Sequence, residues 1–335
     1  MSVCNGALRL ATRGSALARA QADLVARALG EADPASRVDI VEITTAGDER
    51  PGSRGAGSPS PTALAAAGEP GDKSRFVKEI EEALLAGDAD LAVHSAKDVP
   101  GKLPEGLAIV GVPARVDARD ALCGAGALDE LSSGARVGTS SLRRRAQLLA
   151  VRPDLEVLEL RGNVDTRLGR LAAGDFDAVL LALAGLKRLD RREGVALAAD
   201  DFVPAPGQGC LALEARGNDE RAVELATRLT DRASLVTLTA ERAVATALGA
   251  SCRTPIGVHA TLRPGEGELA VESFVGLPDG SAWVRDRIEG GAEGPGELGR
   301  EAAGRLLSAG AEEILIDAEA AQEDADSGPA NRWVR

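Results

Sequence analysis

The segment from Ala92 to Pro100 concentrates side chains that could do chemistry. It reads Ala-Val-His-Ser-Ala-Lys-Asp-Val-Pro and continues an apolar run that begins at Leu91. Pro100 stops the run from continuing as a regular strand. An apolar run that ends in a polar cluster is typical of a buried strand delivering side chains at its carboxyl end, where ligands bind in open α/β sheets. A strand followed by a solvated turn fits the same residues equally well.

Arginine and serine recur where an expected strand turns into an expected helix. Arg13 and Ser15 lie between a strand at 8–12 and an amphipathic helix at 15–29. Such a junction offers free backbone N–H groups and the positive end of the helix dipole, which suits an anion. Ser15 as an ordinary N-cap beside a solvated arginine is an equally good interpretation of this one junction.

Three further junctions of this kind follow expected strands at 136–139, 155–160 and 178–182. They carry Ser141, Arg143, Arg144, Arg145, Arg161, Arg167, Lys187 and Arg188. A single basic run on a helix is usually a solvated face. Repetition favours function, because alternating strands and helices bring such ends to one sheet edge. Guanidinium groups bind carboxylates and phosphates through paired donors, so we expect a small polyanion in a cleft between two α/β lobes.

Composition narrows the class of protein. The chain has 335 residues, enough for two or three domains, and a net charge of -13 with 2% aromatic residues and no Tyr. These values argue against a nucleic-acid surface. No apolar stretch approaches the ~20 residues that span a bilayer, and the first residues lack a secretory signal. We therefore expect a cytoplasmic protein without membrane or nucleic-acid partners.

The cysteines point to one reactive thiol. The four stand at no zinc or redox spacing and are Cys4, Cys123, Cys210 and Cys252. With only two histidines in the chain, we expect no metal site. Cys252 lies in an expected loop at 249–257 beside Arg253, a setting that lowers a thiol pKa and makes the sulfur nucleophilic. Cys210 lies in an apolar strand and is expected to be inert.

The periodicities predict an α/β fold with two lobes, a hinge and a small α+β C-terminal domain. The expected boundaries are 1–112 with 206–230 for the first lobe, 113–205 for the second, and 231–317 for the third domain. That domain should contain strands at 258–262, 269–275 and 282–288, a helix at 296–309 and a last strand at 312–316. Residues 318–335 are expected to be a disordered tail.

A segment rich in Pro, Gly and Ser interrupts the first lobe at 49–71. A loop of this length inside a domain is either a functional lid or disordered. It precedes a helix expected from Ser74 to about Ala86.

Three classes of function compete at this point. A Cys-His hydrolase built on Cys252 would leave the arginines without a role. A serine nucleophile within 94–98 lacks the nucleophile-elbow pattern. A non-catalytic anion-binding module, built like the two-lobed periplasmic ligand-binding proteins, explains the arginines but neither Cys252 nor Asp98.

Seven segments together resemble the signatures of the porphobilinogen deaminase (hydroxymethylbilane synthase) family, in the family's order, between about Leu8 and Ile316. They read Leu-Arg-Leu-Ala-Thr-Arg-Gly-Ser-Ala-Leu-Ala, Ala-Val-His-Ser-Ala-Lys-Asp-Val-Pro, Val-Gly-Thr-Ser-Ser-Leu-Arg-Arg, Leu-Arg-Gly-Asn-Val-Asp-Thr-Arg-Leu, Ala-Gly-Leu-Lys-Arg-Leu, Pro-Gly-Gln-Gly and Cys-Arg-Thr-Pro-Ile-Gly. Seven motifs in order make the resemblance very specific.

The resemblance implies a transferase of porphyrin and heme biosynthesis. It would join four porphobilinogen molecules, with release of ammonia, into the linear tetrapyrrole hydroxymethylbilane. Growth would start on a dipyrromethane cofactor held by a thioether to Cys252, and the enzyme is expected to be a monomer. The implied fold has two lobes similar to periplasmic binding proteins and a third domain that carries the cofactor.

The resemblance also implies roles for single residues. Asp98 matches the catalytic carboxylate, which would accept the pyrrole N–H as positive charge develops there. The residues expected to bind the cofactor are Ser95, Lys97, Ser141, Arg143, Arg144, Arg167 and Arg188. The residues expected to bind substrate are Arg13, Ser15, Arg161, Lys73, Phe76 and Gln208. His94 is expected to lie on the strand and to support its neighbours rather than to catalyse.

Three departures from the family pattern concern the lid. The element Gly-Gly-Lys-Gly-Leu-Phe is here Gly-Asp-Lys-Ser-Arg-Phe at 71–76, and Glu69 replaces a usual lysine. The segment before it is longer than expected. These departures concern the expected contacts of the lid rather than the chemistry.

Overall fold

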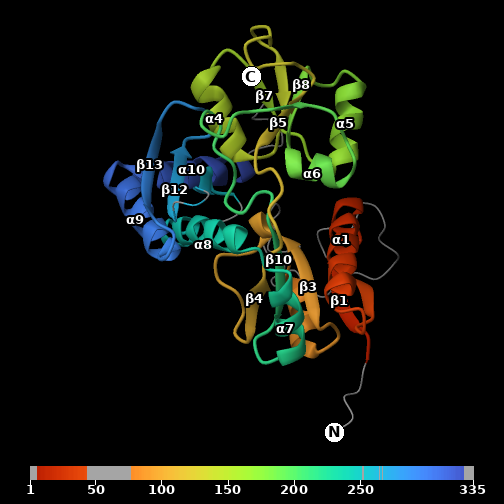
Figure 1. The fold of residues 1–335 in the computed structure, drawn as a ribbon. Helices are drawn as coiled ribbons and strands as arrows, with labels where there is room; N and C mark the ends of the chain where they lie inside the picture. Colours follow the sequence, from red (N-terminus) through yellow and green to blue (C-terminus); the bar gives the residue numbers. More distant parts are fainter. Residues whose placement is uncertain (1–5, 44–76, 251–252, 264, 266, 328–335) are drawn as a thin grey trace. The chain divides into compact units, whose positions relative to one another are not determined.

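The computed structural model describes residues 6–43, 77–250, 253–263, 265 and 267–327. The chain divides into two compact units, Met1–Ala114 with Leu211–Asp231, and Arg115–Cys210 with Arg232–Arg335 (Figure 1). The expected lid at 49–71 and three expected site residues, Lys73, Phe76 and Cys252, lie outside the described residues.

The first unit is built on a five-stranded sheet in the order β2-β1-β3-β10-β4. These strands are β1 (Leu8–Arg13), β2 (Val38–Ile43), β3 (Leu91–Ser95), β4 (Leu107–Gly111) and β10 (Leu211–Arg216). β1 pairs in parallel with β2 and β3, whereas β10 runs antiparallel to both β3 and β4. β10 therefore returns through the sheet beside the strand that carries the polar cluster.

Helices cover both faces of this sheet. α1 (Ala16–Ala32) and α7 (Glu220–Arg228) share one apolar core with the sheet, and α3 (Lys78–Ala86) packs in the core of the opposite face. The side chain of Ser15 caps α1 by accepting the N–H of Ala18. α3 ends at Gly87, whose φ of 77° is a conformation that glycine adopts without strain.

The second unit repeats this plan in its first part. A five-stranded sheet has the order β7-β6-β8-β5-β9, with β6 parallel to β7 and β8, and β5 antiparallel to β8 and β9. The strands are β5 (Asp120–Cys123), β6 (Arg136–Gly138), β7 (Glu156–Leu158), β8 (Ala178–Ala182) and β9 (Val195–Ala196).

Helices flank this second sheet as well. α4 (Leu142–Val151) packs on one face, while α5 (Val164–Ala172) and α6 (Leu183–Arg188) pack on the other. Figure 1 shows α4 and α5 on either side of the strands. Both expected α/β lobes are thus confirmed.

An antiparallel sheet and three helices complete the second unit. The strands β11 (Ile256–Leu262), β12 (Glu268–Gly276) and β13 (Trp283–Gly291) lie in that order. The helices are α8 (Arg232–Ala247), α9 (Pro295–Ser308) and α10 (Ala311–Ser327), and they enclose a common core with the sheet. The small α+β domain expected at the C-terminal end is present.

The last element contradicts the sequence-based expectation. We predicted a strand at 312–316 and a disordered tail at 318–335, but Ala311–Ser327 form the helix α10. Residues 328–335 lie outside the described residues. Among the side chains that the structure describes in α10, those of Ala311, Ile314 and Ala318 are buried. Their spacing of three and four is helical, because it places them on one stripe. The prediction of a strand at 312–316 is therefore wrong.

Two strands of the second unit were not predicted at all. β5 has four residues and β9 has two, too few for periodicity to show. The division into compact units puts the crossings after Ala114, Cys210 and Asp231, and it groups the second lobe with the C-terminal part. The finer division into three domains stays a prediction.

The hairpin between β12 and β13 generates a stability test, because Gly280 lies against α4. A Cβ at Gly280 would come within 2.5 Å of the backbone of Leu149 and Ala150, and its φ is +74°. Gly134 has a φ of +75° with open space around it. Gly134→Ala should cost about 1 kcal/mol for the backbone conformation alone. Gly280→Ala should cost about 1–3 kcal/mol more, because of the steric clash.

Thermal unfolding of the two variants beside the parent protein measures this difference. Equal losses of Tm would contradict the packing of the hairpin on α4.

Candidate active site

In the first unit, two of the chemically interesting junctions share one sheet edge. β1 and β3 are parallel, with Leu10 opposite Leu91, so their carboxyl ends point the same way. Arg13 ends β1 and Ser15 caps the helix that follows, while Ser95 ends β3 and leads into the turn at 96–98. These groups therefore lie at one edge of the sheet.

The polar cluster after β3 is a tight turn rather than a continued strand. Residues Ala96–Asp98 form one turn of 3-10 helix, in which the N–H of Val99 donates to the carbonyl of Ala96. Ala96 is buried, whereas Lys97 and Asp98 are half-buried. His94 lies on the strand itself and is buried, as predicted. The turn thus leaves the ammonium and the carboxylate partly accessible.

In the second unit, three junctions again share one edge, because β6, β7 and β8 are parallel. Ser141 caps α4 by accepting the N–H of Arg144, and Asn163 caps α5 by accepting the N–H of Thr166. Arg167 follows on the first turn of α5, and Arg188 ends α6. The positions of the arginines along the chain therefore follow from the strand ends.

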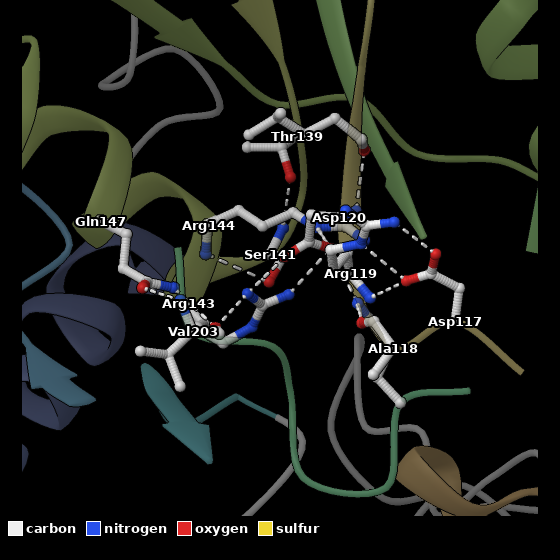
Figure 2. A network of polar contacts seen from close by, with 12 residues as sticks. Asp117, Ala118, Arg119, Asp120, Thr139, Ser141, Arg143, Arg144, Gln147 and Val203 are labelled. Carbon is white, nitrogen blue, oxygen red and sulfur yellow. Dashed lines mark hydrogen bonds and ion pairs between the residues drawn. The ribbon is translucent and has the colours of Figure 1, made fainter. Parts of the chain in front are cut away.

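Asp120 on β5 is the centre of a buried network shown in Figure 2. Its carboxylate accepts hydrogen bonds from Arg143 Nη1 at 2.6 Å and from Arg144 Nε at 2.9 Å. Arg143 also donates to the carbonyl of Val203, and Arg144 donates to the carbonyl of Leu180. One carboxylate therefore anchors two neighbouring guanidinium groups of α4.

Burial and neighbouring groups of opposite charge act in opposite directions on the pKa values of Asp120 and Arg144. Burial would raise the pKa of Asp120, but the charges of Arg143 and Arg144 outweigh it and hold that pKa well below its usual range. Removal from solvent lowers the pKa of Arg144, against the attraction of Asp120. The exposed fractions of the three residues are 0%, 3% and 5%. Two buried cations thus share one buried anion.

Two further arginines have no carboxylate partner among the described residues. Arg167 donates to the carbonyl of Gly162 and to Ser140 Oγ, and Arg188 donates to the carbonyl of Gly209. Burial lowers the pKa of each to about 10, and the charge of Arg144 adds to the effect at Arg167. The Nε of Arg188 is buried and makes no hydrogen bond. Guanidinium groups without a carboxylate partner are the kind of group that binds carboxylates of a ligand.

Comparison with known proteins identifies the family to which the chain belongs. The family model described as "Porphobilinogen deaminase, dipyromethane cofactor binding domain" matches residues 8–224, and the model of the same family's C-terminal domain matches residues 235–308. The chain belongs to the porphobilinogen deaminase family. It is accordingly a transferase, and residues 8–224 are the dipyrromethane cofactor-binding domain of that family.

Relatives in the porphobilinogen deaminase family extend over nearly the whole chain. The porphobilinogen deaminase of Deinococcus radiodurans is 45% identical over 313 residues, which are 91% of this chain and 96% of the relative. That of Thermus thermophilus is 44% identical over 308 residues, again 91% and 96%. Among solved structures, the periplasmic aliphatic sulphonate binding protein of Escherichia coli matches with a TM-score of 0.37 and 16% identity, covering 72% of this chain and 70% of that one.

The structure places several expected site residues in unexpected surroundings. The side chain of Gln208 is fully buried and donates to the carbonyl of Ala118 and to Asp120. Arg143 is engaged by Asp120 and Val203, and Arg161 is exposed and paired with Glu159. Their contacts with substrate or cofactor stay predictions.

Sequence reasoning missed Asp120, which organises the arginines. One signal could have found it, since it is a lone acidic residue that begins the apolar run Asp-Ala-Leu-Cys. A charged residue inside a buried strand needs a partner of opposite charge. Within the described residues, no cluster of His, Cys, Asp and Glu is arranged to hold a metal ion. No helix in those ranges is long and apolar enough to cross a membrane.

Replacing Asp120 by a neutral residue measures how much the network contributes to the free energy of unfolding. Asp120→Asn leaves two buried guanidinium groups without a compensating charge, so it should destabilise the protein by about 3–5 kcal/mol. The control is Asp175→Asn, which removes an exposed ion pair with Arg170 and should cost less than about 1 kcal/mol. Thermal and urea unfolding compare the two. If both variants unfold at the same midpoint, Asp120 does not hold the network.

Proposed function

We propose that this enzyme joins porphobilinogen molecules into hydroxymethylbilane, with release of ammonia, on a dipyrromethane primer bound covalently to Cys252. The observation that carries the proposal is a pair of half-buried arginines, Arg167 and Arg188, that have no carboxylate partner among the described residues and lie in the region that matches the family's cofactor-binding domain. Porphobilinogen carries an acetate and a propionate, so every added ring brings two carboxylates. A site with excess positive charge that is half-buried matches such a ligand.

The residues of the second unit fit the cofactor. Four guanidinium groups, those of Arg143, Arg144, Arg167 and Arg188, are compensated by one described carboxylate, Asp120. The Nε of Arg188 is a buried donor that lacks an acceptor. Carboxylates of a dipyrromethane would supply acceptors of the right charge and planar geometry. When bound, the dipyrromethane supplies the pyrrole carbon to which the first substrate ring is joined.

We assign the binding roles by charge and accessibility. Arg167 and Arg188 would hold carboxylates of the primer directly, while Ser141 would order the start of α4. Arg144 would contribute one face of its guanidinium, and Arg143 its charge. In the first unit, Ser95 and Lys97 would assist in holding the primer.

The remaining assigned residues would serve the incoming substrate. Arg13 at the end of β1 and Ser15 at the start of α1 lie at the same sheet edge as Asp98, and they would bind the carboxylates of the substrate. Arg161, which is exposed, would exchange its partner Glu159 for the substrate. Lys73, Phe76 and Gln208 complete the proposed set.

Asp98 would carry the chemistry. The turn Ala96–Asp98 is fixed at one end by the sheet, so the carboxylate is held in place before substrate arrives. Ammonia leaves as positive charge develops on the pyrrole ring. A fixed carboxylate that accepts the pyrrole N–H stabilises this charge without reorganisation. The same carboxylate can hold and return a proton during the step.

The cellular setting belongs to the proposal as well. We propose a cytoplasmic monomer whose partner is the small-molecule substrate, without membrane or nucleic-acid partners. Light scattering on the purified protein decides between monomer and dimer.

Arg167 provides a test of the anion site. Arg167→Gln should raise KM for porphobilinogen or slow primer assembly by about tenfold or more, because a charge-assisted hydrogen bond of roughly 1.5–3 kcal/mol is lost. Arg170→Gln is the matched control on the same helix, where the arginine is exposed and paired with Asp175. Steady-state kinetics and the occupancy of the primer measure the effect. Equal kinetics in the two variants would contradict the assignment of Arg167.

Asp98 provides a test of the chemistry. Asp98→Asn should keep the fold and the covalent primer but almost abolish turnover, because the amide cannot stabilise the developing charge. Intact-protein mass spectrometry reports the adduct of two pyrrole units, and Cys252→Ser should lack it. Asp88→Asn, an exposed aspartate of the same unit, should behave as the parent protein. Substantial tetrapyrrole production by Asp98→Asn would refute the catalytic role.

A further inference from the structure

The first unit contains a buried polar cluster that has no part in the proposed chemistry. It consists of His94 on β3, Glu214 on β10 and Glu81 on α3. Their exposed fractions are 5%, 0% and 8%. Buried ionisable residues are costly unless their charges are compensated, so their presence in the core calls for an explanation.

The sheet register brings two of these side chains together. In the antiparallel pairing of β3 and β10, Ala92 lies opposite Glu214 and His94 lies opposite Ala212. Residues two apart on a strand share a face, so His94 and Glu214 are diagonal neighbours on the same face. Ala92 packs in the core beneath α3, which identifies this face as the one that α3 covers. His94 Nε2 lies 3.0 Å from a carboxylate oxygen of Glu214.

Several buried polar atoms of this cluster have no hydrogen-bond partner among the described residues. Among the described residues, both oxygens of Glu214 and one oxygen of Glu81 are buried without a hydrogen bond of ordinary geometry. His94 Nε2 is also buried without such a hydrogen bond, so its approach to within 3.0 Å of Glu214 is the contact that would compensate this buried carboxylate. Breaking it by removing one partner would leave the other buried and uncompensated.

The contact between His94 and Glu214 lies directly before the turn Ala96–Asp98 in the chain, so it affects the position of that turn. His94 is the last buried residue of β3, and the next residue, Ser95, begins the turn that carries Lys97 and Asp98. A side chain fixed to β10 at that point restricts where the strand ends. A small misplacement of a reacting group lowers the rate strongly, because the reacting atoms must meet in a narrow range of geometries.

We infer that Glu214 and His94, faced by Glu81 from α3, form a positioning element that fixes the turn of Asp98. Neither residue touches the substrate in this scheme, and both act through the backbone of β3. The inference rests on the proposed role of Asp98 for its effect on turnover.

Protonation of Glu81 belongs to the same element. Burial, followed by the charge of Glu214, raises the pKa of Glu81 to about 7, and His94 opposes this shift. Glu82, on the same helix, raises that pKa further. β4 also packs on α3 and carries no titratable side chain, and Arg216 of β10 contacts the carbonyls at the end of α3. Ionisation of Glu81 therefore adds a second negative charge beside Glu214.

The sign of the pH dependence follows from the direction of this shift. Because the pKa of Glu81 is higher in the folded protein than its ordinary value of 4.5, its contribution to stability is complete below that value. The contribution is lost as the pH rises through about 7. The packing of α3 on the sheet should weaken accordingly in mildly alkaline solution.

The first experiment measures turnover with the primer-loaded enzyme at a temperature well below unfolding. Glu214→Gln and His94→Gln should each lower kcat by about tenfold or more and leave KM within twofold, because substrate contacts are untouched. The double variant should lose no more than the worse single variant, since the two residues act as one unit. The control is Asp90→Asn, which breaks an ion pair with Arg9 at the opposite end of β3. It should lower Tm without changing kcat.

The outcome that overturns the inference is specific. If Glu214→Gln lowers Tm but keeps the parental kcat, the cluster is merely structural and positions nothing. Substitution can also prevent folding, and Glu81→Gln then serves as the second variant, because the amide has nearly the shape of the neutral carboxyl group and cannot ionise.

The second experiment needs no activity. The Tm of Glu81→Gln should match that of the parent protein near pH 5 and should exceed it increasingly as the pH rises through about 7. A constant difference between pH 5 and 8.5 would overturn the proposed protonation of the cluster. If the parent protein fails to convert porphobilinogen, the proposed function fails while this pH-dependent difference remains, so the two failures are distinguishable.

Discussion

A buried carboxylate that must serve two guanidinium groups is the constraint on which the second unit depends. Asp120 begins β5, and both Arg143 and Arg144 come from the first turns of α4, so the pair fixes that helix against the sheet. Breaking the arrangement would leave charges in an interior that cannot solvate them. Because Asp120 supplies one negative charge for two arginines, positive charge remains in excess, and the charge of Arg144 acts on Arg167. The same charged groups would therefore contribute both to the stability of the second unit and to its affinity for an anionic ligand.

Both units solve the same problem with the same topology. In each, three parallel strands bring their carboxyl ends to one edge, and an antiparallel strand inserted beside them supplies a buried acidic residue. That residue is Glu214 on β10 in the first unit and Asp120 on β5 in the second. Each carboxylate lies in contact with a basic side chain from a neighbouring element. An acidic residue on the inserted strand is therefore a feature that the two sheets share.

The sequence predicted what depends on local pattern. Period and capping residues located the strands that carry the functional junctions, and the helices that follow them, because Ser15, Ser141 and the glycine after α3 are local signals. The family signatures identified the family. Asp120 was not predictable in the same way, since its partners lie more than 20 residues away and a four-residue strand has no measurable period. The helix α10 was mistaken for a strand because three apolar residues in five fit both patterns.

Gln208 was predicted from the sequence to bind substrate, but the structure places it in the buried charge network of Asp120. A glutamine between two glycines resembles an exposed binding group, yet its amide donates to Asp120 and completes the acceptor's shell. A side chain's role in such a network is decided by distant partners rather than by its neighbours in sequence. A local sequence motif therefore locates a functional region more reliably than it predicts the role of each residue within the motif.

The sharing of one carboxylate by two arginines also limits how this protein can change over evolutionary time. A substitution at Asp120 would be tolerated only if Arg143 and Arg144 changed with it, because either arginine alone would be left charged and buried. Lysine could not replace them one at a time, since an ammonium lacks the planar fork that reaches Asp120 and a backbone carbonyl together. We therefore expect the three positions to change only together. Related chains should keep all of them or replace all of them.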